Sequence, residues 1–440
     1  MNRHTRYARS ALALAVLLAI AVPGQALAQD AGAQDLEARI AQLEQMVQGL
    51  KAELDAQKAA EAAKPAPPAQ PIQAGTIMPG ANPGTRFSFG GFIKFDSMYT
   101  DTSDGEIPDS STGRLFYVPS TIPVGGVDED GADLDSHIQF SRLWFGADTD
   151  LDGHKLKAYL EMDLFGGALG NEVATNTYGV TIRHAYVSWD KWLAGQTWSN
   201  FQDAGALPDA VDFVGPTEGT IFVRQAQLRY TNGPWSFSLE NPETTYAAHL
   251  TGARGASDDN SLPDLTLRYM HKASWGHFTV AGLARQLKYE TATSSESESA
   301  FALSVSGKWN VGANDDIRYM VSGGSGLGRY LAFGLGPDAM TEADGSLEAL
   351  DGYGGFVAWR HAFSPKLRGN VFYSMAQFDN DPLLTGLALT ESARSFHANL
   401  IYSPLPKIDI GAELIWGNRE LESGADGDIR RLHMHVKYSF

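Results

Sequence analysis

Cysteine is absent from the 440 residues of the chain. Its absence excludes a disulfide framework, thiol catalysis and any metal site that needs thiolate ligands. Cations are also scarce, since 34 Lys and Arg stand against 52 Asp and Glu, for a formal charge of −18. A protein that binds nucleic acid needs a basic surface, so nucleic acid is excluded as a partner.

Long apolar runs are missing as well. No stretch approaches the roughly twenty consecutive apolar residues that a membrane helix needs, which excludes helical inner-membrane proteins. The one run of twelve, ALALAVLLAIAV at residues 11–22, follows a basic leader and precedes the small residues of GQALAQ. This pattern predicts a secretory signal peptide over residues 1–28, cleaved after Ala28. The alternative, an uncleaved anchor, is disfavoured because the run is too short.

Catalytic and cofactor motifs are also lacking. The sequence has no G-x-S-x-G and no H-E-x-x-H. The glycines of GGSGLGR have no strand-to-helix context, so they do not predict a phosphate-binding loop. His433 and His435 share one face of a strand, but a zinc site takes three or four ligands, and a polar lining is the simpler interpretation. We therefore expect no enzyme, no cofactor and no metal site.

A heptad pattern follows the signal peptide. In residues 29–58 apolar side chains recur at alternating steps of four and three, the spacing of a coiled-coil seam. Ile40, Val47 and Leu54 take the a positions, and Leu36, Leu43 and Leu50 take the d positions. Ile and Val at a with Leu at d favour a dimer, while a solvated amphipathic helix is the alternative. Residues 59–85 are rich in Ala, Pro and Gly and predict an extended linker.

Strand-like alternation dominates residues 86–440. The segment RRLHMHVKYSF shows it clearly, because successive side chains point to opposite faces of a strand. One face holds Leu432, Met434, Val436, Tyr438 and Phe440, and the other holds Arg431, His433, His435, Lys437 and Ser439. A strand that is apolar on one face to its last residue predicts a place in a closed sheet, with Phe440 in an aromatic girdle at the periplasmic rim.

The connections between these strands alternate in length. Seven short turns, such as DLDGH and SPLPK, lie between eight long loops, which predicts sixteen strands. The long loops span about 101–134, 166–178, 199–220, 241–262, 290–299, 323–350, 378–392 and 418–428. A soluble sandwich does not require this alternation, but an outer-membrane barrel has short periplasmic turns and long extracellular loops. We therefore predict an all-β fold, a 16-stranded antiparallel transmembrane β-barrel, preceded by a periplasmic coiled-coil helix.

Basic residues recur on the polar faces of the predicted strands. A charge on the lipid face costs about 2–4 kcal/mol at mid-bilayer, so these side chains are expected to line the lumen. The predicted lining residues are Lys155, Lys157, Arg142, Arg183, Arg224, Arg229 and Arg268. Arginine rows in a pore attract anions. The alternative interpretation is that they balance the charge of carboxylates on the wall, and the two interpretations are compatible. These carboxylates are Glu161, Asp163, Glu240 and Glu413.

The block WLAGQTWSNFQDAGALPDAVDFVGPTEGTIFVRQAQLRYT resembles a segment that marks the DcaP-like outer-membrane porins. Supporting segments are GGFIKFDSMY, QFSRLWFGADT, IRHAYVSW and SPLPKIDIGAELIWGNRE. The order of signal peptide, coiled coil, proline-rich linker and barrel, which spans residues 86–440, is also that of the family. The resemblance implies a homotrimer that passes small anionic solutes such as dicarboxylates, and barrel-assembly machinery that reads the last strand.

The resemblance also implies that loop 199–220 folds into the barrel as its constriction. The loop carries Asp203, Asp209, Asp212 and Glu218, which work against an anion preference. The leading hypothesis is a passive diffusion porin in the bacterial outer membrane, in contact with lipid and lipopolysaccharide. A second hypothesis is a structural barrel tethered through its coiled coil to periplasmic partners. An outer-membrane hydrolase is disfavoured because no nucleophile pairs with a base.

Overall fold

The computed structural model describes residues 84–127, 132–167, 175–291 and 295–440, together with 41, 42, 44–49, 51, 52 and 55. The chain divides into two compact units, 1–77 and 78–440. In the first unit the described residues are helical, and Val47 of the predicted seam is 61% exposed. The predicted signal peptide, the rest of the seam and the linker up to residue 83 lie outside the described residues. The coiled coil therefore stays a prediction.

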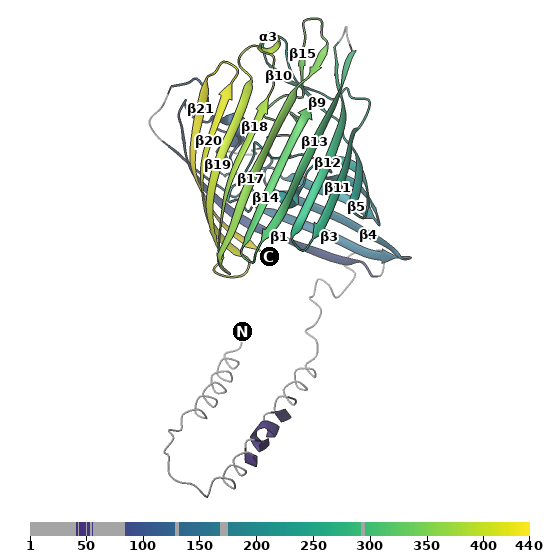
Figure 1. Ribbon diagram of the computed structural model, residues 1–440, viewed down its shortest axis with the longest axis vertical. Helices are drawn as coiled ribbons and strands as arrows, with labels where there is room; N and C mark the ends of the chain where they lie inside the picture. The colour runs from purple at the N-terminus through teal and green to yellow at the C-terminus, as the bar shows by residue number, and fades with distance from the viewer. Residues whose placement is uncertain are drawn as a thin grey trace. The chain divides into compact units, whose positions relative to one another are not determined.

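The second unit is a closed antiparallel β-barrel (Figure 1). Its strands in ring order are β1 (Arg86–Thr102), β2 (Asp133–His137) with β3 (Arg142–Leu151), β4 (His154–Asp163), β5 (Thr181–Trp189), β6 (Trp192–Trp198), β7 (Arg224–Asn232), β8 (Trp235–Glu240), β11 (Asp264–Ala273), β12 (Gly276–Glu290), β13 (Ser295–Val311), β14 (Asp315–Ser325), β17 (Asp351–Ser364), β18 (Leu367–Phe378), β19 (Thr390–Tyr402), β20 (Ile408–Leu421) and β21 (Asp426–Ser439). The connections hold η1 (Thr112–Arg114), η2 (Pro119–Thr121), η3 (Ala204–Ala206), α3 (Pro382–Thr385) and a small sheet of β9 (Thr244–Ala247), β10 (Arg254–Ser257), β15 (Ala339–Thr341) and β16 (Leu347–Ala349).

Strands β2 and β3 together make one member of the ring, because both pair with β1. Asp96 of β1 lies opposite His137 of β2, and Phe92 of β1 lies opposite Arg142 of β3. Residues 138–141 interrupt the strand between them. The 17-stranded sheet is therefore a ring of sixteen, which confirms the predicted all-β barrel and its strand number.

The ring closes between β1 and β21. Their register runs from Phe92 opposite Ser439 to Thr102 opposite Ile429. Beyond it, the N–H of Phe440 donates to the carbonyl of Gly91 at 3.0 Å. Closure satisfies backbone groups that would have no partner in hydrocarbon and leaves the ring without a free strand edge.

The wall is apolar outside and polar inside. On β21, Met434, Val436 and Tyr438 are exposed on the outer face, whereas His433 and His435 are buried on the inner face. Exposed aromatic side chains gather beside the short turns, as an interfacial girdle does. They include Trp189, Trp192, Trp235, Trp275, Trp309, Trp359, Tyr402 and Phe440. The alternation predicted for the last strand is confirmed.

Two of the predicted long loops are short. The β12–β13 ladder continues until Glu290 faces Ser295, so the region 290–299 is mostly strand. The β20–β21 ladder continues until Glu420 faces Asp426, which leaves only residues 422–425 between the strands. Both regions are polar on each face. The strands continue beyond the lipid-facing apolar part of the barrel, so they lack the apolar alternation by which strands were predicted. The prediction of strict alternation was wrong there, although the number of strands does not depend on it.

Three of the remaining connections fold into the barrel and give it a core. Residues of 103–127, 199–223 and 326–350 pack against inward-facing side chains of the wall. The largest cluster joins Phe201, Ile221 and Tyr330 of these connections to Met320 and Phe372 of β14 and β18. An apolar core thus packs against the inner face of the wall along β12 to β19.

Replacing Phe440 by Ser should lower the amount of folded barrel in the outer membrane, because the last strand loses the aromatic ring that ends its apolar face. The amount is measured by heat-modifiable migration of membrane extracts on gels. Tyr402→Ser is the matched control, since it removes a rim aromatic from β19, which is not the last strand. The exposed fractions are similar, 45% for Tyr402 and 42% for Phe440. Equal losses for the two variants would remove any special role of the last strand.

Candidate solute-binding site in the barrel lumen

The connection between β6 and β7, residues 199–223, crosses the lumen and is held to the wall along its length. Its attachment points are the Gln202 carbonyl with Arg268, Asp203 with His277, the Leu207 carbonyl with Arg318, Asp209 with Arg368, the Val211 carbonyl with Lys94, and Asp212 with His433. These partners lie on β11, β12, β14, β18, β1 and β21. The connection therefore lines more than half of the barrel's inner circumference.

Asp203 fixes the first part of this connection. Its carboxylate lies 2.9 Å from Nε2 of His277 and accepts hydrogen bonds from Ser306 Oγ at 3.0 Å and the Gly205 N–H at 3.1 Å. Burial alone would raise the pKa of Asp203, but the hydrogen bond and charge of His277 hold that pKa below its usual value. Asp203 is thus an ionised anchor for the connection.

Asp212 fixes the middle. It accepts hydrogen bonds from the N–H groups of Tyr117, at 2.8 Å, and of Val214 and Gly215, both at 3.0 Å. His433 lies 3.4 Å away and also contacts Asp96 at 2.9 Å. Burial alone would raise the pKa of Asp212, but His433 and the N–H groups hold that pKa well below its usual value.

Glu218 and Asp209 complete the set. Glu218 is fully buried, where it accepts hydrogen bonds from Tyr117 and from Ser395 Oγ at 2.8 Å, and burial raises the pKa of Glu218. Asp209 is more exposed and pairs with Arg368. All four carboxylates predicted at the constriction therefore hold the connection to its surroundings. Each of them is engaged by an ion pair or by hydrogen-bond donors.

The predicted basic residues fall into three groups, and the first group, Arg142 and Arg183, is ion-paired. Arg183 donates to Glu161 at 3.0 Å and to Asp163 at 2.7 Å, and its guanidinium lies over the ring of Phe213. Arg142 lies 3.3 Å from Glu161. For these two arginines the second interpretation, balance of the wall carboxylates, is the one that the contacts support.

The second group has no carboxylate within ion-pair distance in the described part of the chain. Arg229 donates to the side chain of Gln227 and to the carbonyl of Trp198, and Arg268 donates to the carbonyl of Gln202 at 3.2 Å. The carboxylates Glu240 and Glu413 bind other groups, among them Gln225 and His397. Arg229 and Arg268 thus make no direct ion pair with a described residue, and the carboxylates that act on them, Glu240 on both and Asp203 on Arg268, do so at longer range.

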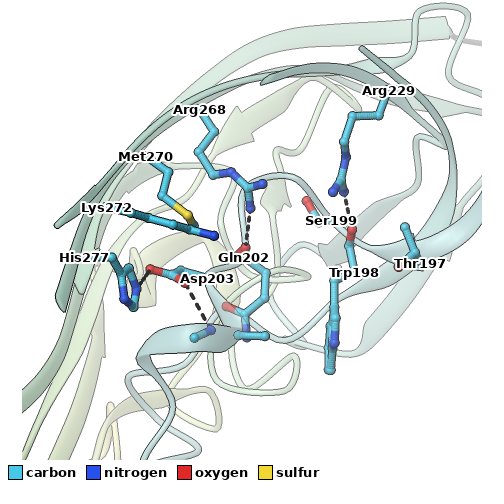
Figure 2. Close-up of a pocket in the computed structure, with 12 residues that line it drawn as sticks. Thr197, Trp198, Ser199, Gln202, Asp203, Arg229, Arg268, Met270, Lys272 and His277 are labelled. Atoms are coloured by element: carbon cyan, nitrogen blue, oxygen red, sulfur yellow. Dashed lines mark hydrogen bonds and ion pairs between the residues drawn. The ribbon is translucent and has the colours of Figure 1, made fainter. Parts of the chain in front are cut away.

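A cavity of about 360 Å³ lies between these two arginines and the start of the connection (Figure 2). Figure 2 shows Arg229, Arg268 and Lys272 reaching into it from the wall, with Gln202 and Asp203 opposite. Lys272 and His277 face each other in register beside the turn that joins β11 to β12. The cavity therefore lies in the half of the barrel near the short turns.

The remaining predicted residues lie elsewhere. Lys155 and Lys157 line a separate groove of about 690 Å³ at the short-turn rim, together with Asp148, Asp150 and Asp190. Arg224 opens β7 in the register of the outward residues, and its guanidinium lies over Trp198 and Phe222, at 4.9 and 5.6 Å from the ring centroids. The structure does not bring these three residues into the cavity, because lumen facing was inferred from strand patterns that break down at strand ends.

The sequence analysis missed Lys272, His277 and Trp198. Lys272 carried a usable signal, since positions 268, 270 and 272 alternate on one face of β11. His277 and Trp198 carried none, because each owes its role to the connection that folds onto it. The histidines 433 and 435 take structural roles, with His435 Nδ1 3.3 Å from the Val211 carbonyl. Among the described residues no group of three or more side chains is placed to hold a metal ion, and no helix is long and apolar enough to cross a membrane.

A closed ring of sixteen antiparallel strands, apolar outside and polar inside with a connection across the lumen, defines an outer-membrane porin. A family model described as DcaP outer membrane protein matches residues 19–440. The chain belongs to the DcaP outer membrane protein family, in agreement with the resemblance seen in the sequence. No protein with a curated description matches the chain.

Solved structures agree with this fold. The outer membrane channel DcaP of Acinetobacter baumannii matches with a TM-score of 0.68 and 23% identity, over 81% of this chain and 98% of that one. An anion-selective porin from Comamonas acidovorans matches with a TM-score of 0.48 and 10% identity, over 81% and 100%. Salmonella typhi OmpF in complex with daunomycin matches with 0.49 and 13%, over 81% and 98%. The first likeness shows a shared fold, and the other two are too remote to add to it.

Replacing Asp212 by Ala should lower the free energy of unfolding by about 3 kcal/mol, because it leaves Nδ1 of the fully buried His433 and three N–H groups without their acceptor. The measurement is thermal unfolding of the purified barrel in detergent. Asp209→Ala is the matched control on the same connection. Asp209→Ala should lower the free energy of unfolding by only about 1 kcal/mol. The Asp209 side chain is 31% exposed, and without it Arg368 still has its ion pair with Asp409. Equal losses would contradict the assignment of Asp212 as the main anchor.

Proposed function

We propose that this porin admits small anionic solutes by passive diffusion and binds them transiently at Arg229, Arg268 and Lys272. The observation that carries the proposal is the contrast between the two kinds of charge in the lumen. The carboxylates of the connection are engaged with the wall, whereas Arg229 and Arg268 have no carboxylate partner among the described residues. An anion that enters the cavity therefore meets three cations, Arg229, Arg268 and Lys272. The single carboxylate among the described residues that line the cavity is that of Asp203, which is paired with His277.

The chemistry of the cavity favours carboxylates. A guanidinium is always charged and offers a planar fork that matches the two oxygens of a carboxylate. Arg229 lies opposite Ser238 on β8, and Arg268 lies opposite Ser236 on the same strand. Two strand spacings, about 10 Å, separate β7 from β11, and the two serines lie two residues, about 7 Å, apart along β8. The backbones of Arg229 and Arg268 are therefore about 12 Å apart. Two cationic side chains based at that separation suit a solute with two carboxylates, so dicarboxylates are the solute class we propose.

Self-association is the second part of the proposal. Strands β3 to β8 have only six to ten residues, while β12 to β14 and β17 to β21 have 11 to 17. On the outer face of the short strands a groove of about 440 Å³ is lined by the small residues Ala147, Ala158, Ala185 and Ala194, with Phe145 and Val187. Small residues allow protein surfaces to approach closely in a membrane. We propose that this groove is the contact face of a homotrimer.

The orientation follows from the porin class. The rim with the short turns faces the periplasm and the rim with the long connections faces outward. The predicted coiled coil would then lie on the periplasmic side, as a proposal that the described residues do not test. The cavity at Arg229 and Arg268 belongs to the periplasmic half of the pore.

Replacing Arg229 and Arg268 together by Ser should shift the reversal potential under a salt gradient towards cations and weaken block by succinate. The physical reason is the loss of the two free guanidinium groups from the cavity. Planar bilayers at 0.1 M salt are suitable because screening is only partial there. Arg394→Ser is the control, since Arg394 is exposed on the outer face of β19. A wild-type pore that prefers cations would sink the anion proposal and leave the barrel intact.

Replacing Ala158 by Trp should dissociate the trimer, because the indole fills the groove that a neighbouring subunit is proposed to contact. The oligomeric state is read from unheated gels and from light scattering in detergent. Val321→Trp is the control, since Val321 is 60% exposed on the outer face of the long strand β14. Both substitutions add a large apolar side chain, so neither places a charge on the lipid-facing surface during membrane insertion. Trimers that survive Ala158→Trp would place the interface elsewhere.

A further inference from the structure

Six phenylalanines meet inside the barrel, and the pore function proposed above leaves them without a role. The phenylalanine cluster consists of Phe116, Phe140, Phe165, Phe213, Phe222 and Phe333. Its members come from connection 103–127, the break between β2 and β3, the segment after β4, connection 199–223 and connection 326–350. Five segments that are far apart in the sequence thus each supply phenylalanine rings to the same cluster.

The rings are in direct contact. Phe116 is fully buried, and its ring centroid lies 5.2 to 5.8 Å from those of Phe140, Phe165, Phe213 and Phe333. Phe213 stacks on Phe140 at 4.2 Å. Phe222 lies 5.9 Å from Phe213 and 5.6 Å from Phe333. The cluster is therefore continuous.

The cluster occupies one side of the lumen, next to the anion cavity. Phe140 lies at the break between β2 and β3, and Phe222 lies two residues before β7, so the cluster lies along the β2–β7 side. On the other side, from β12 to β19, the apolar core around Tyr330 and Phe372 packs against the wall. Arg183 and Arg224 lie against the cluster, over Phe213 and Phe222. Trp198, which also contacts Phe222, lines the anion cavity.

The backbone that carries Phe333 is strained. Ala332, Phe333 and Gly334 have φ of 56°, 58° and 73°, all in the left-handed region. A bulky residue there is an outlier, and such strain gathers at sites that change conformation. The Ala332 N–H donates to the Thr220 carbonyl at 3.1 Å, and the Phe222 N–H donates to the Tyr330 carbonyl at 2.9 Å. A movement of the strained turn therefore moves Phe222 as well.

We propose that the phenylalanine cluster is a hydrophobic gate, which decides the size of solute that passes and opens when Phe333 withdraws. A hydrophobic constriction in a pore excludes water and so blocks ions without any charge barrier. The gate rests on the proposed pore function, but it acts on width rather than on charge. It makes Phe213 and Phe333 specificity-determining residues.

The test uses the full-length protein with Phe213→Ala and Phe333→Ala. Each variant should raise single-channel conductance by about twofold or more, because the cluster rewets when one ring is lost. Liposomes that carry either variant should swell in a neutral trisaccharide that the wild type excludes. Phe237→Ala is the control, since Phe237 is exposed on the outer face of β8.

Two further results keep the gate separate from the anion proposal and from misfolding. Both alanine variants should keep the wild-type sign of the reversal potential, whichever sign that is. If an alanine variant does not fold, Phe213→Asn takes its place, because a polar side chain wets the gate without emptying it. Unchanged conductance and unchanged trisaccharide exclusion in the folded variants would overturn the gate. A cation-selective wild type with wider alanine variants would overturn the anion proposal alone.

Discussion

The closure of the ring between β1 and β21 is the constraint on which the rest of this structure depends. Backbone N–H and C=O groups find no partner in hydrocarbon, so a sheet in a membrane must return to its first strand. Closure fixes which side of each strand is outside, and a strand's period of two then separates apolar from polar side chains. It also creates an enclosed volume, into which connections 103–127, 199–223 and 326–350 fold.

Within that volume, charge serves two separate purposes. Asp203 and Asp212 are desolvated, and each is stabilised by a histidine of the wall and by N–H groups of the connections. Such buried pairs fix one geometry, because breaking either partner leaves an unpaired buried charge. Arg229 and Arg268 have no carboxylate within ion-pair distance among the described residues, and both line a cavity of about 360 Å³. The carboxylates of connection 199–223 thus serve as anchors, whereas Arg229 and Arg268 make no direct ion pair with any described residue.

The sequence predicted what depends on local periodicity and failed where distant segments meet. The outward face of β21 followed from alternation at Met434 and Val436, and the strand number followed from the turns. The partner of Asp212 could not be predicted, because His433 lies on the last strand and only the fold brings the two together. The same holds for the phenylalanine cluster, whose rings come from five segments. Polar composition alone misassigned 290–299 and 418–428 as loops, since strands outside the apolar band need no apolar face.

The two faces of the short strands are linked by geometry. Inside, β3, β4 and β5 carry the ion-paired set of Arg142, Glu161 and Arg183. Outside, the same strands present the small residues of the proposed trimer groove, among them Ala158 and Ala185. Neighbouring residues of a strand point to opposite faces, so a subunit packed into the groove restrains the backbone that positions the inner ion pairs. Assembly at this face would therefore stiffen the wall beside the phenylalanine cluster, while the core along β12 to β19 supports the opposite side from within.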